Sequence, residues 1–156
     1  MDNTGDNTHK PHSLLENIPA ELKGYKQWVT WKRSKGKNSK RPYNAVTGRP
    51  AASDNPASWS SFEQAQEAVL KGSADGVGFV LTDDDPFTFI DLDHVIVDGT
   101  IEPWADELIK RLNSNTEISQ SGRGIHILIK GKKPGDRSKS ERVEIYDHGH
   151  YFALTG

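Results

Sequence analysis

The spacing of apolar and polar side chains predicts a series of short strands along the chain. Several runs place aliphatic side chains at every second position, which is the period of a strand with one buried face. Others are continuously apolar, or rich in β-branched and aromatic residues. The predicted strands lie at residues 27–33, 76–81, 87–93, 116–119, 125–130, 143–146 and 151–154. Residues 35–40 are predicted as a basic loop and 43–49 as a turn.

Three segments carry helix signals. Residues 14–23 predict a short helix, and residues 103–112 begin with proline and predict a longer one. Ser60 and Glu63 have the spacing of a capping box, which predicts a helix running to about residue 71 and ended by Gly72. The apolar stripe of the last helix is predicted to comprise Trp104, Leu108 and Leu112. Strands and helices together predict an α+β fold, a mostly antiparallel sheet with about three flanking helices.

Length and composition place the chain among small proteins without disulfides. Its 156 residues suit one compact domain, predicted over residues 14–156 and preceded by a disordered polar tail at 1–13. The absence of cysteine excludes thiol catalysis, disulfide scaffolds and cysteine-ligated zinc or iron–sulfur sites. No apolar run approaches the roughly 18 residues of a membrane span, so we expect a cytoplasmic protein without membrane contact.

The charges are grouped, although the net charge of −2 gives no general attraction to nucleic acid. Residues 83–102 contain seven acids and neither Lys nor Arg, and residues 32–41 and 130–142 each contain six basic side chains. The first basic group consists of Lys32, Arg33, Lys35, Lys37, Lys40 and Arg41. These groups are either solvated loops or a carboxylate cluster for a cation, flanked by basic arms for a polyanion.

Strand alternation places the candidate chemistry on one face. Asp91 and Asp93 share a face of their strand, and His126 and Glu144 likewise lie opposite the aliphatic side chains of theirs. If these strands share one sheet, the four side chains converge. Oxygen ligands of this kind suit Mg²⁺ or Mn²⁺ better than Zn²⁺. Without a cation, repulsion between the acids raises the pKa of at least one of them. The alternatives are a solvent-exposed edge for the acids and a hydrogen-bonded histidine at the edge of the core.

A glycine-rich turn precedes His126. In Ser121-Gly122-Arg123-Gly124 the glycines free backbone amides to face an anion, and the arginine fork suits a phosphate. An ordinary hairpin turn is the alternative, because hairpins use glycine frequently. Farther upstream, Trp28, Trp31 and Tyr43 either stack on bases or pack in the core, and core packing is the favoured interpretation.

Three segments resemble a known family. In order, FIDLDHV, TEISQSGRGIHILIKG and VEIYDHGHYFALTG resemble the bifunctional primase–polymerase (prim-pol) branch of the archaeo-eukaryotic primase superfamily, typical of phage and plasmid replication proteins. The upstream segments IPAELKGYKQWVTWK, KRPYNAVTG and GVGFVL also resemble this branch, so the resemblance covers residues 18–156. It implies a catalytic core around a sheet like that of an RNA-recognition module (RRM). It also implies a metal-dependent DNA primase and polymerase of DNA replication, a nucleotidyltransferase.

The resemblance assigns roles to individual residues. The DxD motif maps onto Asp91 and Asp93 and the third acid onto Glu144, which implies two Mg²⁺ or Mn²⁺ ions held by these three acids, with His126 as a further catalytic residue. The motif around the glycine turn maps onto Ser121, Gly122, Gly124 and His126, which implies that they bind the nucleotide. Arg123, as a phosphate clamp, and His150 are further candidates for nucleotide binding by their own chemistry. The implied partners are a single-stranded DNA template with its primer, a dNTP or NTP, and a helicase domain or other replication proteins. The basic residues 32–41 are the expected DNA-binding segment.

The chain also departs from the family. Asn115 stands where an aromatic residue is expected, Gln120 where a proline is, and His150 where an arginine is. The chain ends directly after the third motif, so we expect a fragment or a natural minimal form. Two alternative functions remain: a non-catalytic module that binds single-stranded nucleic acid, and a rolling-circle nickase. The nickase would use His148 and His150 with a nucleophilic tyrosine, Tyr146 or Tyr151.

Overall fold

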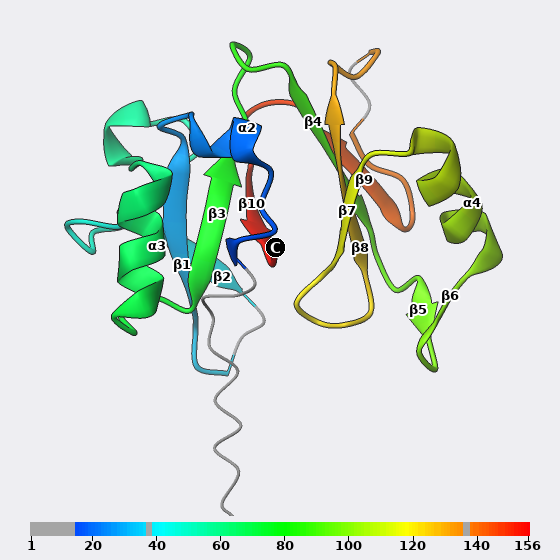
Figure 1. The fold of residues 1–156 in the computed structure, drawn as a ribbon, viewed down its shortest axis with the longest axis horizontal. Coiled ribbons are helices and arrows are strands. Elements are labelled where there is room, and N and C mark those ends of the chain that lie inside the picture. The colour runs from blue at the N-terminus through cyan, green and yellow to red at the C-terminus, as the bar shows by residue number, and fades with distance from the viewer. Residues whose placement is uncertain (1–14, 37–38, 136–137) are drawn as a thin grey trace, which may run out of the picture.

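A computed structural model describes residues 15–36, 39–135 and 138–156 (Figure 1). The predicted tail and Lys37 lie outside these ranges. The helices are α2 (Ala20–Lys23), η1 (Pro56–Ser58, a 3₁₀-helix), α3 (Phe62–Leu70) and α4 (Pro103–Leu112). The strands are β1 (Trp28–Arg33), β2 (Lys40–Tyr43), β3 (Gly76–Val80), β4 (Phe87–Leu92), β5 (Ile96–Val97), β6 (Thr100–Ile101), β7 (Asn115–Ile118), β8 (Ile125–Lys130), β9 (Val143–Tyr146) and β10 (Tyr151–Leu154).

The strands form two four-stranded antiparallel sheets and a small hairpin. The first sheet has the order β10-β3-β1-β2 and the second β7-β8-β4-β9, while β5 pairs with β6. Figure 1 shows the two sheets side by side, with α3 flanking the first and α4 flanking the second. The α+β prediction is therefore confirmed. The expectation of one sheet is wrong, because the chain passes from one sheet to the other between β3 and β4 and returns at β10.

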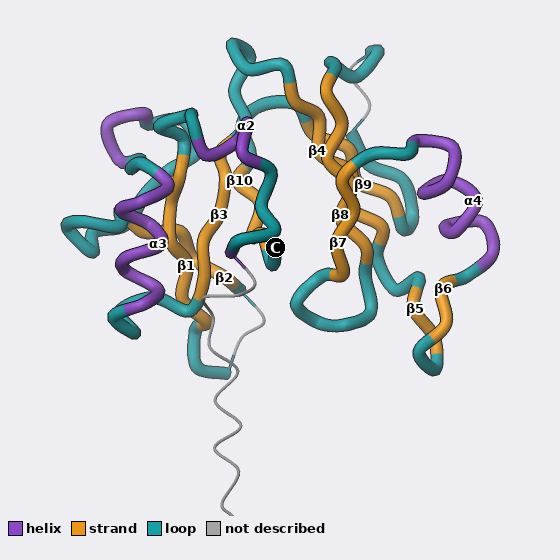
Figure 2. Tube along the Cα trace, viewed as in Figure 1, coloured by secondary structure: helices purple, strands orange, loops and turns teal. Residues whose placement is uncertain are grey.

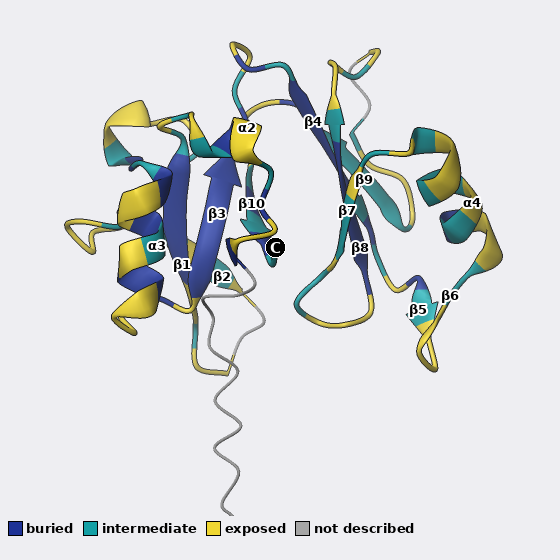
Figure 3. Cartoon of the chain, in the orientation of Figure 1, coloured by how far each residue is buried: buried dark blue, intermediate teal, exposed yellow. Residues whose placement is uncertain are grey.

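Aromatic side chains join the two sheets. Trp28 and Phe79 of the first sheet lie edge to face with ring centroids 5.2 Å apart, and both belong to the main core. Phe152 of β10 stacks on Phe89 of β4 at a centroid distance of 3.7 Å. Figure 3 shows that the central strands of both sheets are buried. The two sheets thus share one aromatic core.

The opposite face of the second sheet carries its own aliphatic core. Ile90 and Leu92 of β4 pack with Ile125 and Ile127 of β8, beneath Ala105 of α4. Strand alternation correctly predicted this face. The predicted stripe of α4 is wrong at one position: Trp104 is 39% exposed, and its ring lies 5.5 Å from the Arg142 guanidinium.

Several predicted boundaries need correction. The cap of α3 is Ser61 with Gln64, not Ser60 with Glu63: the Ser61 hydroxyl accepts the Gln64 amide, and the Gln64 side chain accepts the Ser61 amide. Residues 40–43, expected as loop and turn, form β2. Pro42 and three charged or polar neighbours hide this strand from propensity rules. Figure 2 shows the loops that join these elements.

Candidate active site

One row of polar side chains crosses the second sheet. Backbone register pairs Glu117 of β7 with His126 of β8, His126 with Asp91 of β4, and Asp91 with Glu144 of β9. Residues that are directly opposite in neighbouring strands project to the same face. The predicted convergence of Asp91, His126 and Glu144 is therefore what the strand pairing produces. Glu117 is a fourth member that the sequence analysis did not identify.

His126 lies between two carboxylates. Its Nδ1 is 3.1 Å from Oε1 of Glu117, and its Nε2 is 3.6 Å from Oδ1 of Asp91. Burial acts to raise the pKa of Glu117, but hydrogen bonds from His126 and from two backbone amides bring it below the ordinary value. Glu117 is therefore an ionised acceptor, so Nδ1 of His126 donates to it and Nε2 is the atom that faces Asp91.

The carboxyl group of Asp91 is held in an unfavourable setting for charge. Its side chain is 23% exposed. Burial raises the pKa of Asp91, and repulsion from Asp93 and Glu144 raises it further, while His126 and Lys40 oppose the rise. A raised pKa of this kind is expected among clustered acids. An acid whose charged form is disfavoured by its surroundings is typical of functional sites.

Asp93 follows the last residue of β4 and is held through its backbone. Its amide donates to the carbonyl of Arg142, and its carbonyl accepts from Nε of the same arginine at 3.3 Å. The Arg142 guanidinium also makes two hydrogen bonds with the carboxylate of Glu102, at 2.8 and 2.9 Å. The next residue, His94, has a φ of 53°. The turn after β4 is thus tied to β9 and to the start of α4.

Glu144 has its own polar neighbours. Lys139 forms a 3.0 Å ion pair with it, and the Tyr146 hydroxyl donates to it at 3.3 Å. His150 lies over the Tyr146 ring at 3.7 Å. Burial lowers the pKa of His150, and Glu144 partly offsets this. These contacts place His150 beside Glu144 at one end of the row, although His150 does not belong to the row.

The predicted glycine turn connects β7 and β8, the two strands that carry Glu117 and His126. The backbone of Arg123 accepts hydrogen bonds from the amides of Val95 and Ile96, so the turn is joined to the segment that follows Asp93. Ser121 and Gly122 are exposed, and Gly122 has a φ of 73°. The Arg123 side chain is also exposed. The turn therefore presents polar groups to solvent near the strand ends that carry the acids.

The basic segment forms a hairpin with like charges opposite one another. Lys32 is paired with Arg41, and Arg33 with Lys40, in the register of β1 and β2. Directly opposed like charges are unfavourable unless an anion lies beside them. Burial and Arg33 lower the pKa of Lys40, whereas Asp91 raises it, so this lysine of the first sheet is within electrostatic reach of the acidic row. Lys35 lies in the following turn.

The upstream tryptophans are core residues. Trp28 is fully buried and Trp31 is 3% exposed, and both indole nitrogens donate to backbone carbonyls. This confirms the core-packing interpretation for both. Tyr43 is half-buried, and the Lys32 ammonium lies 5.4 Å from its ring.

The acids fit a divalent cation by their chemistry. In the part of the chain that the structure describes, no three His, Asp or Glu side chains are close enough together to hold a metal ion. Asp91, Asp93 and Glu144 nevertheless offer hard oxygen donors, and their mutual repulsion is what a cation relieves. We therefore treat these three acids as candidate ligands.

The histidines of the nickase alternative do not act together. Nδ1 of His148 is 2.7 Å from Asp147, and its other neighbour is Asp83 at 3.5 Å. His150 instead lies over Tyr146. The Tyr151 hydroxyl donates to the Lys40 carbonyl, and burial raises the pKa of Tyr151 to about 12. Such a phenol is a poor nucleophile.

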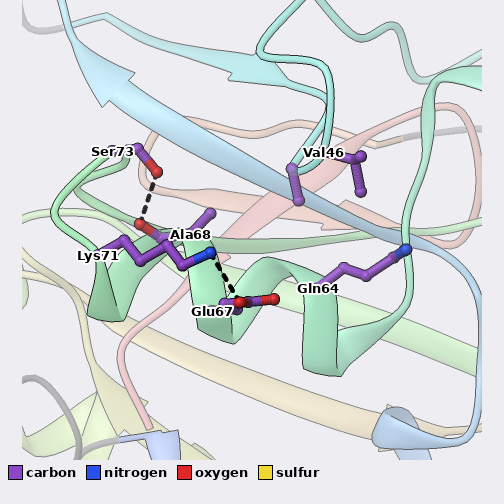
Figure 4. A pocket seen from close by; sticks show the side chains of 7 residues that line it. Val46, Gln64, Glu67, Ala68, Lys71 and Ser73 are labelled. Atoms are coloured by element: carbon purple, nitrogen blue, oxygen red, sulfur yellow. Dashed lines mark hydrogen bonds and ion pairs between the residues drawn. The ribbon is translucent and has the colours of Figure 1, made fainter.

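A pocket beside α3 lies apart from this row. It is lined by Val46, Gln64 and Ala68 among others, and by Glu67 and Lys71, which form a 2.8 Å ion pair on α3 (Figure 4). None of the site residues predicted from the sequence lines it. The candidate catalytic residues therefore lie on the polar row of the second sheet and not in this pocket.

Comparison with known proteins supports one class of function. The chain is similar to the DNA primase-polymerase of Nitratiruptor phage NrS-1, with 40% identity over 153 residues. The alignment covers 92% of this chain and 21% of that protein, so the chain spans about a fifth of the relative's length. A scan against models of protein families finds no match. Among the described residues, no helix is both long and apolar enough to span a bilayer.

Proposed function

We propose that the chain is the catalytic unit of a DNA primase-polymerase of the prim-pol branch, a metal-dependent nucleotidyltransferase. It would add nucleotides to a 3′-hydroxyl on a single-stranded DNA template. The observation that carries the proposal is the position of Asp91, a half-buried acid of raised pKa that lies between His126 and Glu144 in one row. Similarity to a DNA primase-polymerase supports the same class.

The acids are the proposed metal ligands. Asp91, Asp93 and Glu144 would hold Mg²⁺ or Mn²⁺, and two ions are expected. When bound, such ions neutralise the triphosphate and lower the pKa of the attacking hydroxyl. In the reaction, the 3′-hydroxyl loses its proton to solvent and its oxygen forms a bond to the α-phosphorus. The bond from the α-phosphorus to the bridging oxygen of the β-phosphate breaks, and pyrophosphate leaves.

The chain's other groups would bind and orient the nucleotide. His126 projects from the same face as Asp91, with Nε2 toward it, and in its imidazolium form it can donate from Nε2 to a phosphate oxygen while Nδ1 still donates to Glu117. The turn from Ser121 to Gly124 adds backbone amides and the Arg123 guanidinium. His150, beside Tyr146, is placed to contact the sugar or base.

The hairpin of β1 and β2 would follow the template. Its two basic pairs, Lys32 with Arg41 and Arg33 with Lys40, lie on the two faces of the hairpin, and both could contact a polyanion. Lys40 connects the second pair electrostatically to Asp91. Template phosphates would relieve the repulsion between the opposed charges.

Primer extension with purified protein tests the proposal. The assay would use a labelled primer on a single-stranded template with dNTPs and either Mg²⁺ or Mn²⁺. We expect Asp91→Ala combined with Asp93→Ala to abolish extension, and Asp106→Asn to retain it. Asp106 is a matched acid on α4 that pairs only with Lys110 among the described side chains.

The outcomes separate the alternatives. Extension by the wild type that is lost in the double variant supports the proposal. Retained extension by the folded double variant contradicts it. Binding of labelled single-stranded DNA without extension under any condition instead favours the non-catalytic module.

A further inference from the structure

Glu117 makes contacts that the proposed catalytic role of the row does not require. Its carboxylate accepts from Nδ1 of His126 at 3.1 Å and from the amides of Thr155 and Gly156 at 2.9 to 3.1 Å. The side chain is 11% exposed. One carboxylate thus joins His126 to the two residues that follow β10, a strand of the other sheet.

This arrangement leaves the His126 ring little freedom. Glu117 accepts a hydrogen bond from Nδ1, and the Phe89 ring packs on the imidazole with centroids 5.1 Å apart. Because an ionised carboxylate only accepts, the neutral imidazole is held in the tautomer with its proton on Nδ1. Nε2 is then the only ring nitrogen left to face Asp91 and a substrate.

The backbone amides in turn fix the carboxylate. Both oxygens of Glu117 receive the Thr155 amide, and Oε2 also receives the Gly156 amide. The Thr155 hydroxyl donates to the Ile118 carbonyl in the same strand as Glu117. Figure 1 shows this C-terminal segment lying between the two sheets. The two backbone amides therefore orient the Glu117 carboxylate, and the carboxylate in turn orients the His126 imidazole.

We propose that Glu117 is a positioning residue that fixes the tautomer and ring orientation of His126 for nucleotidyl transfer. The inference rests on the proposed function for its kinetic consequence, whereas the tautomer itself is a property of the folded chain. Partners of this kind, one shell behind a reacting group, typically change activity by 10- to 100-fold when removed.

Two variants separate positioning from simple structural support. In Glu117→Gln, the single side-chain oxygen can accept a hydrogen bond either from His126 or from the backbone amides. The NH₂ group, which only donates, then faces the other partner. Thr155→Pro removes the Thr155 amide and hydroxyl from the network but leaves the bond between Glu117 and His126. The position before it, Leu154, is in a strand and accepts a following proline.

The first measurement is steady-state incorporation of a dNTP. We expect Glu117→Gln to lower kcat by about 10- to 100-fold with little change in KM, because orientation of His126 matters in the transition state. We expect Thr155→Pro to lower the melting temperature at least as much as Glu117→Gln does. It should nevertheless keep most of kcat. Parallel losses of kcat and stability in the two variants would show that Glu117 is only structural, as would unchanged kcat in Glu117→Gln.

The second measurement does not depend on activity. In ¹⁵N NMR spectra of histidine-labelled protein, assigned with His126→Gln, we expect His126 to carry its proton on Nδ1 in the wild type. In Glu117→Gln the proton should move toward Nε2. An unchanged tautomer contradicts the positioning role. If the wild type shows no incorporation at all, the proposed function fails, and the tautomer comparison still decides the role of Glu117.

Discussion

Replacing the central carboxylate should stabilise the protein. Asp91→Asn keeps the shape of the side chain and removes its charge. Side chains directly opposite on neighbouring strands have Cβ atoms about 5 Å apart, and two like charges at that distance repel by roughly 3 kcal/mol at an effective dielectric constant of about 20. The attraction of His126, 3.6 Å away, offsets part of this. We therefore expect a gain of about 1 to 2 kcal/mol at neutral pH.

The gain should depend on pH with a definite sign. Burial and repulsion from the neighbouring acids raise the pKa of Asp91 in the folded state. A raised folded pKa makes wild-type stability greatest below the unfolded pKa of about 3.9, and this contribution is lost as pH rises through the folded pKa. The advantage of Asp91→Asn over the wild type should therefore be small at low pH and should grow toward neutral pH.

Urea unfolding and thermal melting across this pH range are the assays. A gain of 1 to 2 kcal/mol corresponds to an increase of about 2 to 8 °C in melting temperature for a chain of this size. Asp106→Asn is the matched control, and its melting temperature should not rise because Asp106 lies in an exposed ion pair. If Asp91→Asn proves less stable than the wild type at neutral pH, the carboxylate is a structural group and the reasoning fails.

Two further predictions concern the turn and the basic hairpin. A Cβ on Gly124 would lie 2.9 Å from the Ser119 hydroxyl and 3.0 Å from the Leu92 carbonyl, so Gly124→Ala should cost about 1 to 3 kcal/mol and speed amide hydrogen exchange along β8. Gly122→Ala, where the Cβ meets open space, should cost about 1 kcal/mol through its positive φ and leave that exchange unchanged; equal exchange in the two variants would contradict the account. Lys32→Ala and Arg41→Ala should each reduce the slope of log affinity against log salt for single-stranded DNA by about 0.7, measured by fluorescence anisotropy. Lys110→Ala on α4 should leave that slope unchanged, and an unchanged slope in the hairpin variants would remove this surface from DNA binding.

The faces of the strands could be predicted from sequence because a period of two is local. Alternation alone placed Asp91, His126 and Glu144 opposite the aliphatic side chains, and the structure pairs their strands as neighbours. Alternation does not say which strands are partners, however. The division into two sheets depends on where the chain crosses, so it could not be derived from the same pattern.

Residues missed by the sequence analysis depend on register or on tertiary contacts. Glu117 meets His126 only because β7 and β8 pair in one register across an intervening turn, and a shift by one residue would move it to the other face. Lys40 acts near Asp91 because β2 is a strand, and Pro42 makes that strand hard to recognise. Trp104 was assigned to the buried stripe of α4, but its first-turn position instead places it beside Arg142.

The most direct test of the proposed active site is single-turnover incorporation of one nucleotide by Asp91→Asn, with Mn²⁺ present and with the primer and template saturated by protein. This variant should be folded and more stable than the wild type, so a loss of activity cannot be ascribed to unfolding. We predict that incorporation falls to background in Asp91→Asn and persists in Asp106→Asn. Incorporation by Asp91→Asn at the wild-type rate would show that the row centred on Asp91 is not the site of nucleotidyl transfer.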